Sequence, residues 1–199
     1  MRRVVILALL AALAMPIAAW ADTITVDNKF GSISISLAGI SSTHSEMKTY
    51  NGLNAGPGHS LGYVSFGTGA FSGTSLASSG TFSSTGSWFD IVRGGKNGGT
   101  IFSGSFVGPI TWTLTSPAGS RKLTFTLTGN LVGMLANGHE AKGTTTQYFV
   151  STGYQIGKGV AHITGGTTSI SSTPEPGTLG LLGTGLVGIA GIFRRRKSA

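Results

Sequence analysis

The sequence contains no cysteine. This absence excludes disulfide bonds, a thiol nucleophile, covalent attachment of a c-type haem, a lipid anchor on cysteine and every metal site built from thiolates. Acidic residues are also scarce, with six Asp and Glu among 199 residues. General acid–base catalysis needs converging titratable side chains, and few are available here. We therefore expect no catalytic, cofactor-binding or metal-binding residues, and we expect the protein not to be an enzyme.

Positive charge is plentiful, but much of it lies at the two ends of the chain. The formal net charge is +8, and Arg2, Arg3 and the run Arg194–Lys197 supply much of it. The other cations are spread along the sequence, with no basic patch that interleaves aromatic residues. A nucleic-acid interface normally shows such a patch, so no nucleic-acid partner is expected.

The N-terminal segment has the parts of a secretory signal peptide. Two arginines precede the apolar run Val4–Leu13, and Ala19 and Ala21 fit the small-x-small pattern that signal peptidase reads. An N-terminal anchor helix is the alternative, but ten apolar residues fall well short of the ~20 that span a bilayer. We expect a signal peptide over residues 1–21, cleaved after Ala21, and hence an exported protein.

The C-terminal segment combines an uncharged apolar stretch, residues 177–193, with a cluster of cations. As a helix this stretch would be about 25 Å long at 1.5 Å per residue. That length nearly matches a hydrocarbon core of about 30 Å, and local thinning of the bilayer can supply the difference. Lys and Arg stay on the cytoplasmic side of a membrane, so the body would lie outside. The sequence therefore predicts one transmembrane helix, followed by the stop-transfer residues Arg194, Arg195, Arg196 and Lys197.

A short motif, Pro174-Glu175-Pro176, stands directly before this segment. The triplet, the glycine-laced apolar stretch and the terminal cations occur in an order that resembles the PEP-CTERM sorting domain of Gram-negative bacteria. The resemblance covers about residues 173–197 and does not extend to the body.

The resemblance implies an address for the protein. In that family an exosortase, a membrane cysteine protease-transpeptidase, processes the tail, and Pro174, Glu175 and Pro176 would form its recognition element. It also implies an inner-membrane-anchored intermediate that is later released to the cell surface or the exterior. Family members are commonly surface or matrix proteins of bacteria that make exopolysaccharide, which makes extracellular polysaccharide an expected partner.

The body shows the alternation of apolar and polar residues that is typical of β-strands. In Ser32–Leu37 the apolar side chains fall on one face and the serines on the other. Residues 110–114 and 123–127 alternate in the same way around a Ser-Pro-Ala-Gly-Ser turn and predict a hairpin. Many short strands separated by Gly- and Asn-rich turns favour an all-β, antiparallel sandwich or jelly roll. A β-solenoid is the alternative, although the sequence has no fixed repeat.

These signals divide the chain into four parts: a signal peptide (1–21), a β-sandwich body (22–163), a Gly/Ser/Thr-rich linker (164–173) and a sorting tail (174–199). The linker is predicted from its glycines and its many hydroxyl groups, which are typical of a flexible stalk.

The body offers few residues that could carry out catalysis or bind a metal ion. Asp90 and Glu140 are a conceivable pair of glycosidase carboxylates, but no motif supports the pairing. His139-Glu140 begins like a zinc-protease motif, yet position 143, where a second histidine would stand, is glycine. His44 and Glu46 could place two ligands on one face of a strand, but surface residues of a loop are the commoner explanation of such a pair.

Carbohydrate binding is an activity that does not require a recognisable sequence motif. Sugar rings stack on exposed aromatic side chains, and the candidates are Trp88, Phe89, Trp112 and Tyr63. The alternation places Trp112 in the core and leaves Trp88 or Phe89 exposed. The sequence thus favours an exported structural or adhesive protein of the cell surface or matrix, associated with exopolysaccharide or biofilm. The alternative is an exported carbohydrate-binding or carbohydrate-active hydrolytic protein.

Overall fold

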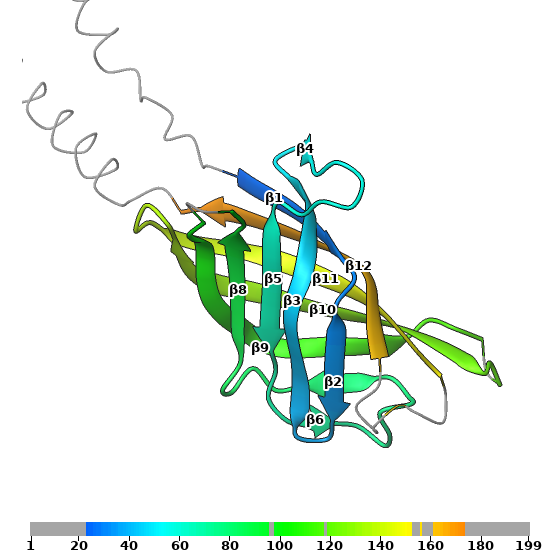
Figure 1. Cartoon of the computed structure of the whole chain (residues 1–199). Coiled ribbons are helices and arrows are strands. Elements are labelled where there is room, and N and C mark those ends of the chain that lie inside the picture. The colour runs from blue at the N-terminus through cyan, green and yellow to red at the C-terminus, as the bar shows by residue number, and fades with distance from the viewer. Residues whose placement is uncertain (1–22, 96–97, 118, 153–155, 157–160, 174–199) are drawn as a thin grey trace, which may run out of the picture. The chain divides into compact units, whose positions relative to one another are not determined.

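The computed structural model describes residues 23–95, 98–117, 119–152, 156 and 161–173, and all regular structure in this part is β-strand (Figure 1). The strands in chain order are β1 (Thr23–Lys29), β2 (Ser32–Ser36), β3 (Gly39–Tyr50), β4 (Leu53–Asn54), β5 (Gly62–Gly67), β6 (Phe71–Ser72), β7 (Gly80–Phe82), β8 (Trp88–Arg93), β9 (Thr100–Leu114), β10 (Lys122–Leu135), β11 (Glu140–Thr152) and β12 (Ala161–Ser172).

Eight long strands close into a ring. The hydrogen-bonded order is β10-β11-β12-β1-β3-β5-β8-β9, and β9 pairs back with β10. Strand β2 continues β1, because both pair with β12 and with β3. The break between them falls at Phe30 and Gly31, whose φ angles are 65° and 100°. Each of these eight strands pairs antiparallel with the one of the eight that follows it along the chain, which makes an up-and-down β-barrel.

The expected sandwich or jelly roll is therefore wrong in its architecture, although the all-β, antiparallel prediction is confirmed. Antiparallel pairing of β12 with β1, in which Asp27 lies opposite Thr167, closes the sheet on itself. In a jelly roll, Greek-key connections would interrupt the chain order of neighbouring strands, whereas this ring follows chain order up to the closing pair of β12 and β1. Alternation along single strands is the same in both architectures, so it does not distinguish them.

Residues predicted to form a linker belong to the barrel. Strand β12 runs through residues 164–172 and pairs with β1 and β11 along this length. Its hydroxyl groups alternate between the exterior, as at Thr167, and the interior, as at Thr168. The compact unit that holds the barrel accordingly extends over Asp22–Ser172 and includes these residues.

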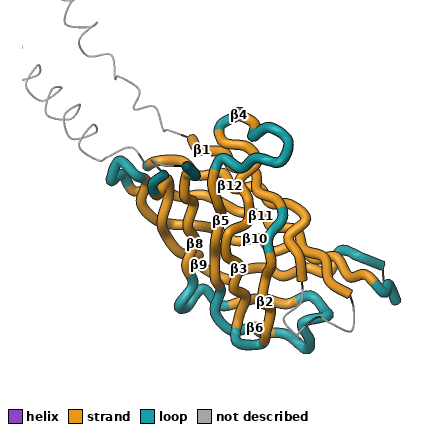
Figure 2. The backbone as a smooth tube through the Cα atoms, in the orientation of Figure 1, coloured by secondary structure: helices purple, strands orange, loops and turns teal. Residues whose placement is uncertain are grey.

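The barrel is flattened, and its interior is filled by aromatic side chains. In Figures 1 and 2, strands β2, β3, β5 and β8 cross in front of β10, β11 and β12, and β9 runs from beside β8 to beside β10. Between them Trp112 stacks on Phe125 with ring centroids 4.4 Å apart, and the rings of Phe66 in β5 and Phe149 in β11 lie 6.4 Å apart. The Trp112 indole N–H donates to the Leu76 carbonyl at 3.1 Å, so its one polar atom is satisfied. This confirms the prediction that Trp112 lies in the core.

A network of buried polar side chains crosses the same interior. Asn28 Nδ2 donates to Ser45 Oγ and to Gln147 Oε1, both at 2.8 Å, and Gln147 Nε2 donates back to Asn28 Oδ1 at 3.1 Å. Gln147 Nε2 also donates to Thr145 Oγ1 at 2.9 Å, and the Thr145 and Thr168 hydroxyls lie 2.8 Å apart. These five side chains are at most 2% exposed. Their mutual bonds tie together β1, β3, β11 and β12, the strands around the closure.

Candidate functional site

One broad outer surface of the barrel is covered by hydroxyl groups. We call it the hydroxyl face, and it comprises outward residues of β9, β10, β11, β12 and β1: Thr111, Thr113, Thr124, Thr126, Thr128, Thr144, Thr146, Thr167, Ser169, Ser171, Thr23 and Thr25. Each of these strands contributes residues at alternate positions, since successive side chains of a strand point to opposite faces. The inward residues between them include Trp112, Phe125 and Leu127, whose burial fixes which residues face outward.

Strand register aligns these hydroxyls into rows across the sheet. In the longest row Thr111 pairs with Thr128, Thr128 with Thr146, and Thr146 with Thr167. The row continues through Asp27 of β1 to Thr49 of β3. A second row pairs Asn130, Thr144, Ser169 and Thr25 in the same way. Neighbouring strands lie about 4.8 Å apart and alternate residues about 6.8 Å, so the hydroxyls form a regular grid.

Hydrogen bonds within the longest row orient its hydroxyl groups. Thr167 Oγ1 donates to Asp27 Oδ1 at 2.8 Å, and Thr49 Oγ1 donates to Asp27 Oδ2 at 2.6 Å. A hydroxyl that donates its proton sideways retains lone pairs that can accept from the solvent side. The Asp27 end of the row therefore presents hydrogen-bond acceptors, while the Thr128 and Thr146 hydroxyls, 3.4 Å apart, can rotate to donate or accept.

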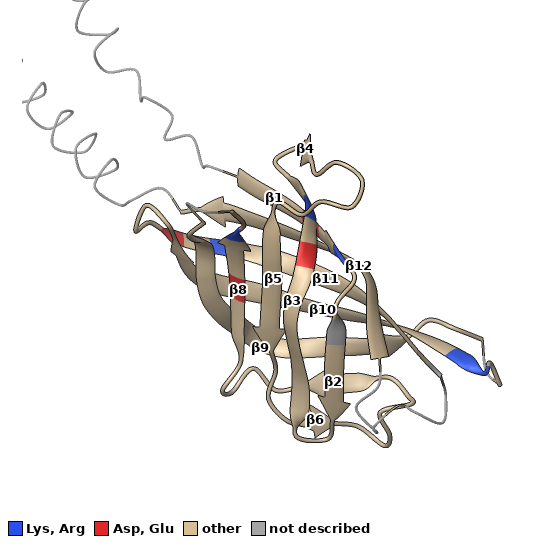
Figure 3. Ribbon diagram, viewed as in Figure 1, with Lys and Arg blue, Asp and Glu red and all other residues tan. Residues whose placement is uncertain are grey.

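Charges on these five strands are few, as Figure 3 shows for the whole ribbon. The Lys, Arg, Asp and Glu residues among them are Asp27, Lys29, Lys122, Glu140 and Lys142, and Lys29, Lys122 and Glu140 lie at strand ends. A surface of this kind interacts through many weak, neutral hydrogen bonds rather than through a few strong ionic ones. Its chemistry matches a partner that is itself rich in hydroxyl groups and repetitive.

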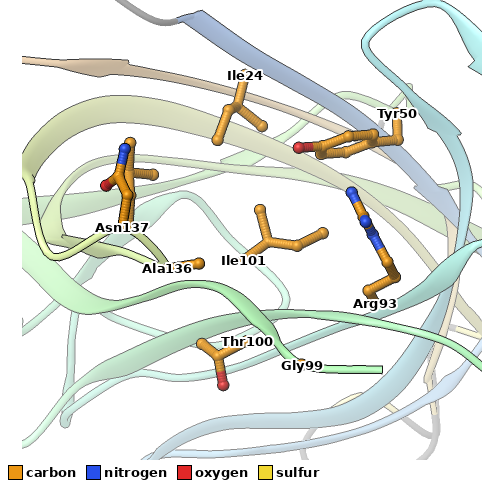
Figure 4. A pocket seen from close by; sticks show the side chains of 9 residues that line it. Ile24, Tyr50, Arg93, Gly99, Thr100, Ile101, Ala136 and Asn137 are labelled. Atoms are coloured by element: carbon orange, nitrogen blue, oxygen red, sulfur yellow. The ribbon is translucent and has the colours of Figure 1, made fainter. Parts of the chain in front are cut away.

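A second feature is a cavity at one end of the barrel, where β1 and β9 begin and where β3, β8 and β10 end (Figure 4). Its volume is about 330 Å³. The lining residues are Ile24, Tyr50, Arg93, Gly99, Thr100, Ile101, Leu135, Ala136 and Asn137. Arg93 reaches toward Tyr50, with its guanidinium carbon 5.4 Å from the centre of the ring.

Asp90 and Glu140 do not converge on this cavity or on each other. They lie in one row that runs from Asp90 through Ser103 and Met134 to Glu140. Three strand spacings separate them, which is about 14 Å along the sheet. This exceeds the separation of about 5–10 Å that glycosidase carboxylates need.

His44 and Glu46, two further candidates, make contacts that are common between side chains at a protein surface. Glu46 pairs with Lys48, with 2.5 Å between Oε2 and Nζ, while His44 packs edge-on against Tyr63 at 5.3 Å between ring centroids. Both His44 and Glu46 lie in β3, so the expectation that they belong to a loop is wrong. His139 lies in the turn before β11, which begins at Glu140. Across the described ranges no group of three or more His, Asp or Glu side chains is arranged to hold a metal ion.

The aromatic candidates divide between core and surface. Trp112 and Phe89 are fully buried, so the more exposed member of the Trp88-Phe89 pair is Trp88. Its indole lies across Gly67, where an added Cβ would come within 2.3 Å of Nε1. Tyr63 is 40% exposed and is the candidate most open to a ligand ring.

Sequence reasoning did not find the hydroxyl face or the cavity. A signal for the first exists in the sequence: Thr-x-Thr or Thr-x-Ser recurs at 23–25, 111–113, 124–128, 144–146 and 167–169. Only the register shows that these five segments are neighbours. The cavity residues come from five strands and from the loops at Gly99 and at Ala136 and Asn137, and they have no shared motif.

Comparison with known protein families identifies the C-terminal tail. Residues 172–197 match the model of the PEP-CTERM protein-sorting motif. The chain carries a PEP-CTERM motif. No curated protein and no solved structure matches the chain.

The PEP-CTERM motif implies an exported protein that an exosortase sorts and processes, with a membrane-associated intermediate before the surface. The predicted sorting element Pro174–Pro176 falls within the match, as do the cations Arg194–Lys197. These residues lie outside the described part of the structure, as do the signal-peptide positions Ala19 and Ala21. The apolar segment 177–193 lies outside it too, and the described strands and loops include no helix suited to crossing a membrane.

Proposed function

We propose that the barrel is a non-enzymatic structural or adhesive component of the cell surface or biofilm matrix that binds polysaccharide along the hydroxyl face. The observation that carries this proposal is the row from Thr111 to Thr49, in which six strands present oxygen atoms in register. The PEP-CTERM motif supplies a matching location, because it implies export to the surface.

Repetition can make weak contacts sufficient for binding. One hydrogen bond between neutral groups contributes only about 0.5–1.5 kcal/mol net, because both partners leave water. A repeating polymer on a repeating grid can make many such bonds, and after the first the others form at high effective concentration. Because the hydroxyl face has few charges, it also avoids the repulsion or ion pairing that a charged patch would bring to a neutral glycan.

A non-enzymatic role is supported by the placement of the carboxylates. Asp90 and Glu140 are held three strand spacings apart, and Asp27 is the carboxylate that stands within the longest hydroxyl row. Asp27 is already bonded to two threonine hydroxyls, which suits a fixed acceptor better than a proton carrier.

A binding assay tests the proposal. The full chain, inserted in lipid nanodiscs, is mixed with microcrystalline cellulose as an insoluble neutral glycan and sedimented. The variant Thr128→Val/Thr146→Val keeps side-chain shape and strand propensity but removes two adjacent hydroxyls of the row. We expect it to bind at least about tenfold more weakly, since it loses several hydrogen bonds per polymer contact.

The matched control is Ser41→Ala/Thr43→Val, which removes two exposed hydroxyls of β3 that lie outside both the hydroxyl face and the cavity lining. It should bind as the parent protein does. Two results would show that the hydroxyl face is not a glycan-binding surface. One is an equal loss of binding in both variants. The other is that neither the parent protein nor the control sediments with cellulose, or with agarose or dextran beads tested in the same way.

A further inference from the structure

The cavity at the barrel end has a closed apolar floor. Ile24, Ile101 and Leu135 are 8%, 7% and 6% exposed, so their side chains seal the aromatic core from the cavity above. An eight-stranded barrel has an interior that side chains can fill, or that can hold one small ligand at its mouth. Here the aromatic core fills the interior, and at this end a ligand would meet an apolar base and a polar rim.

The rim carries the guanidinium group of Arg93. Among the residues that the structure describes, Arg93 forms no ion pair, and no carboxylate lines the cavity. Arg93 instead lies over the ring of Tyr50, with 5.4 Å between guanidinium carbon and ring centroid. A guanidinium held over an aromatic face by the ring quadrupole keeps N–H donors that can bind a planar anion.

The other polar groups of the rim are also able to donate. Asn137 Oδ1 accepts from the backbone N–H of His139 at 3.1 Å, which leaves the Asn137 NH₂ group to face a ligand. The hydroxyl of Tyr50, which points toward the other lining side chains in Figure 4, adds a further donor. A site whose rim combines one cation with several donors selects an anion over a cation.

We propose that this cavity binds a compact organic anion, with a single carboxylate on a flat ring or short apolar body. The carboxylate pairs with Arg93 in the two-pronged manner that guanidinium favours, and the body rests on Ile24, Ile101 and Leu135. The cavity volume of about 330 Å³ lies at the small end of ligand sites, which excludes long acyl chains.

This site is separate from the hydroxyl face, so it goes beyond the proposed function and does not depend on it. Of its lining residues, none belongs to the hydroxyl face as defined above. The glycan-binding proposal and the anion-binding proposal can therefore hold or fail independently, and each is tested with its own variants.

The test uses three probes that share one ring system. The full chain in nanodiscs is titrated calorimetrically with 2-naphthoate, with the neutral 2-naphthamide and with the cationic 2-naphthylmethylammonium, and empty nanodiscs give the blank. We expect one naphthoate per chain, binding of naphthamide at least about tenfold weaker and no binding of the ammonium probe. Added salt should weaken naphthoate binding and leave naphthamide unchanged.

Variants then assign the effect to Arg93. Arg93→Gln should weaken naphthoate at least about tenfold while leaving naphthamide unchanged, and Arg93→Lys should fall between, since lysine keeps the charge but loses the planar fork. Arg121→Gln, an exposed arginine in the turn between β9 and β10, is the matched control and should bind as the parent does. Unfolding curves of each variant confirm that the barrel is intact.

Three results would overturn the proposal: no saturable naphthoate binding by the folded parent, equal affinity for naphthoate and naphthamide, or full naphthoate affinity in folded Arg93→Gln. A further variant, Ile101→Phe, fills the space above the floor and should abolish binding of both ring probes. Binding that survives in that variant places the probe elsewhere and also rejects the cavity as the site.

Discussion

At the scale of single residues, the barrel depends on a few polar side chains that are buried and fully engaged. Asn28 and Gln147 exchange hydrogen bonds across the interior while both are nearly inaccessible to solvent. A buried amide that loses its partner costs more than the bond contributes, because the orphaned group stays desolvated. The Asn28–Gln147 pair therefore stabilises the native register of β1 and β11 relative to a shifted register.

Replacing Gln147 with leucine should destabilise the protein strongly. The change leaves the Asn28 amide without a donor for Oδ1 and without one of its acceptors, at an expected cost of about 2–4 kcal/mol in the free energy of unfolding. Urea unfolding followed by tryptophan fluorescence measures this cost. The control is Thr146→Val, a change at the outward neighbour, which should cost under about 0.5 kcal/mol.

The double variant Asn28→Leu/Gln147→Leu removes both amides together. It should cost less than the sum of the two single changes, since neither amide is then left unsatisfied. Strictly additive costs would mean that the two side chains are not coupled.

At the scale of strands, β9 is the element that turns the barrel from one layer to the other. Its first half pairs with β8, its second half pairs with β7, and β10 follows its whole length with a shift in register opposite Gly129. The shift contains Gly108, whose φ is 72°, followed by Pro109. A bulge of this kind bends a strand, and glycine makes its left-handed residue accessible.

Gly108→Ala should therefore destabilise the barrel by about 1–2 kcal/mol, although an added Cβ would meet no atom within 4 Å. The cost comes from backbone conformation alone. Gly99→Ala is the matched control, because Gly99 is equally open but has no left-handed φ, and it should be neutral or slightly stabilising. Thermal unfolding of both variants measures the difference. Equal behaviour would contradict the role given to the bulge.

Strand-level prediction from the sequence succeeded where the inward residues are apolar. The hairpin of 110–114 and 123–127 is confirmed, with Trp112 opposite Leu127 as the alternation requires. Strand β3 was missed, because two of its inward residues are serines, Ser42 and Ser45, and a register shift between them breaks the alternation. The start of β12 was predicted as a strand, but its residues 164–172 were mistaken for a linker for the same reason, since their interior positions include Gly166 and Thr168.

The candidate surfaces were beyond prediction for a different reason. Tyr63 was correctly considered as an exposed ring, but the hydroxyl face and the cavity each depend on which strands are neighbours. That information is carried by the closure of the barrel and not by any local pattern. The tail could be read in advance, because a sorting motif is a contiguous string of residues that a membrane enzyme must recognise without the body.

At the scale of the molecule, β12 decides whether the barrel exists. It pairs with β11 on one side and with β1 and β2 on the other, and its pairing with β1 and β11 extends to Ser171 and Ser172. A chain that ends at Thr173 retains all of these partners, whereas a chain that ends at Ile163 leaves two long strands with bare edges.

We therefore expect the chain ending at Thr173 to unfold cooperatively in urea, and the chain ending at Ile163 to lack cooperative unfolding and to aggregate. Circular dichroism and analytical ultracentrifugation distinguish the two outcomes. Cooperative folding of the shorter chain would mean that residues 164–172 act as a linker after all.

Pairing of the first strand with the last also has a consequence for timing. The hydrogen bond from Thr167 to Asp27 joins residues 140 positions apart, and contacts of such long range make folding slow. A polypeptide that crosses a membrane channel from its N-terminus delivers β1 early and β12 late. Since β12 ends two residues before Pro174, the last strand and the sorting signal leave such a channel in immediate succession, and the slow closure of the barrel follows the arrival of the signal.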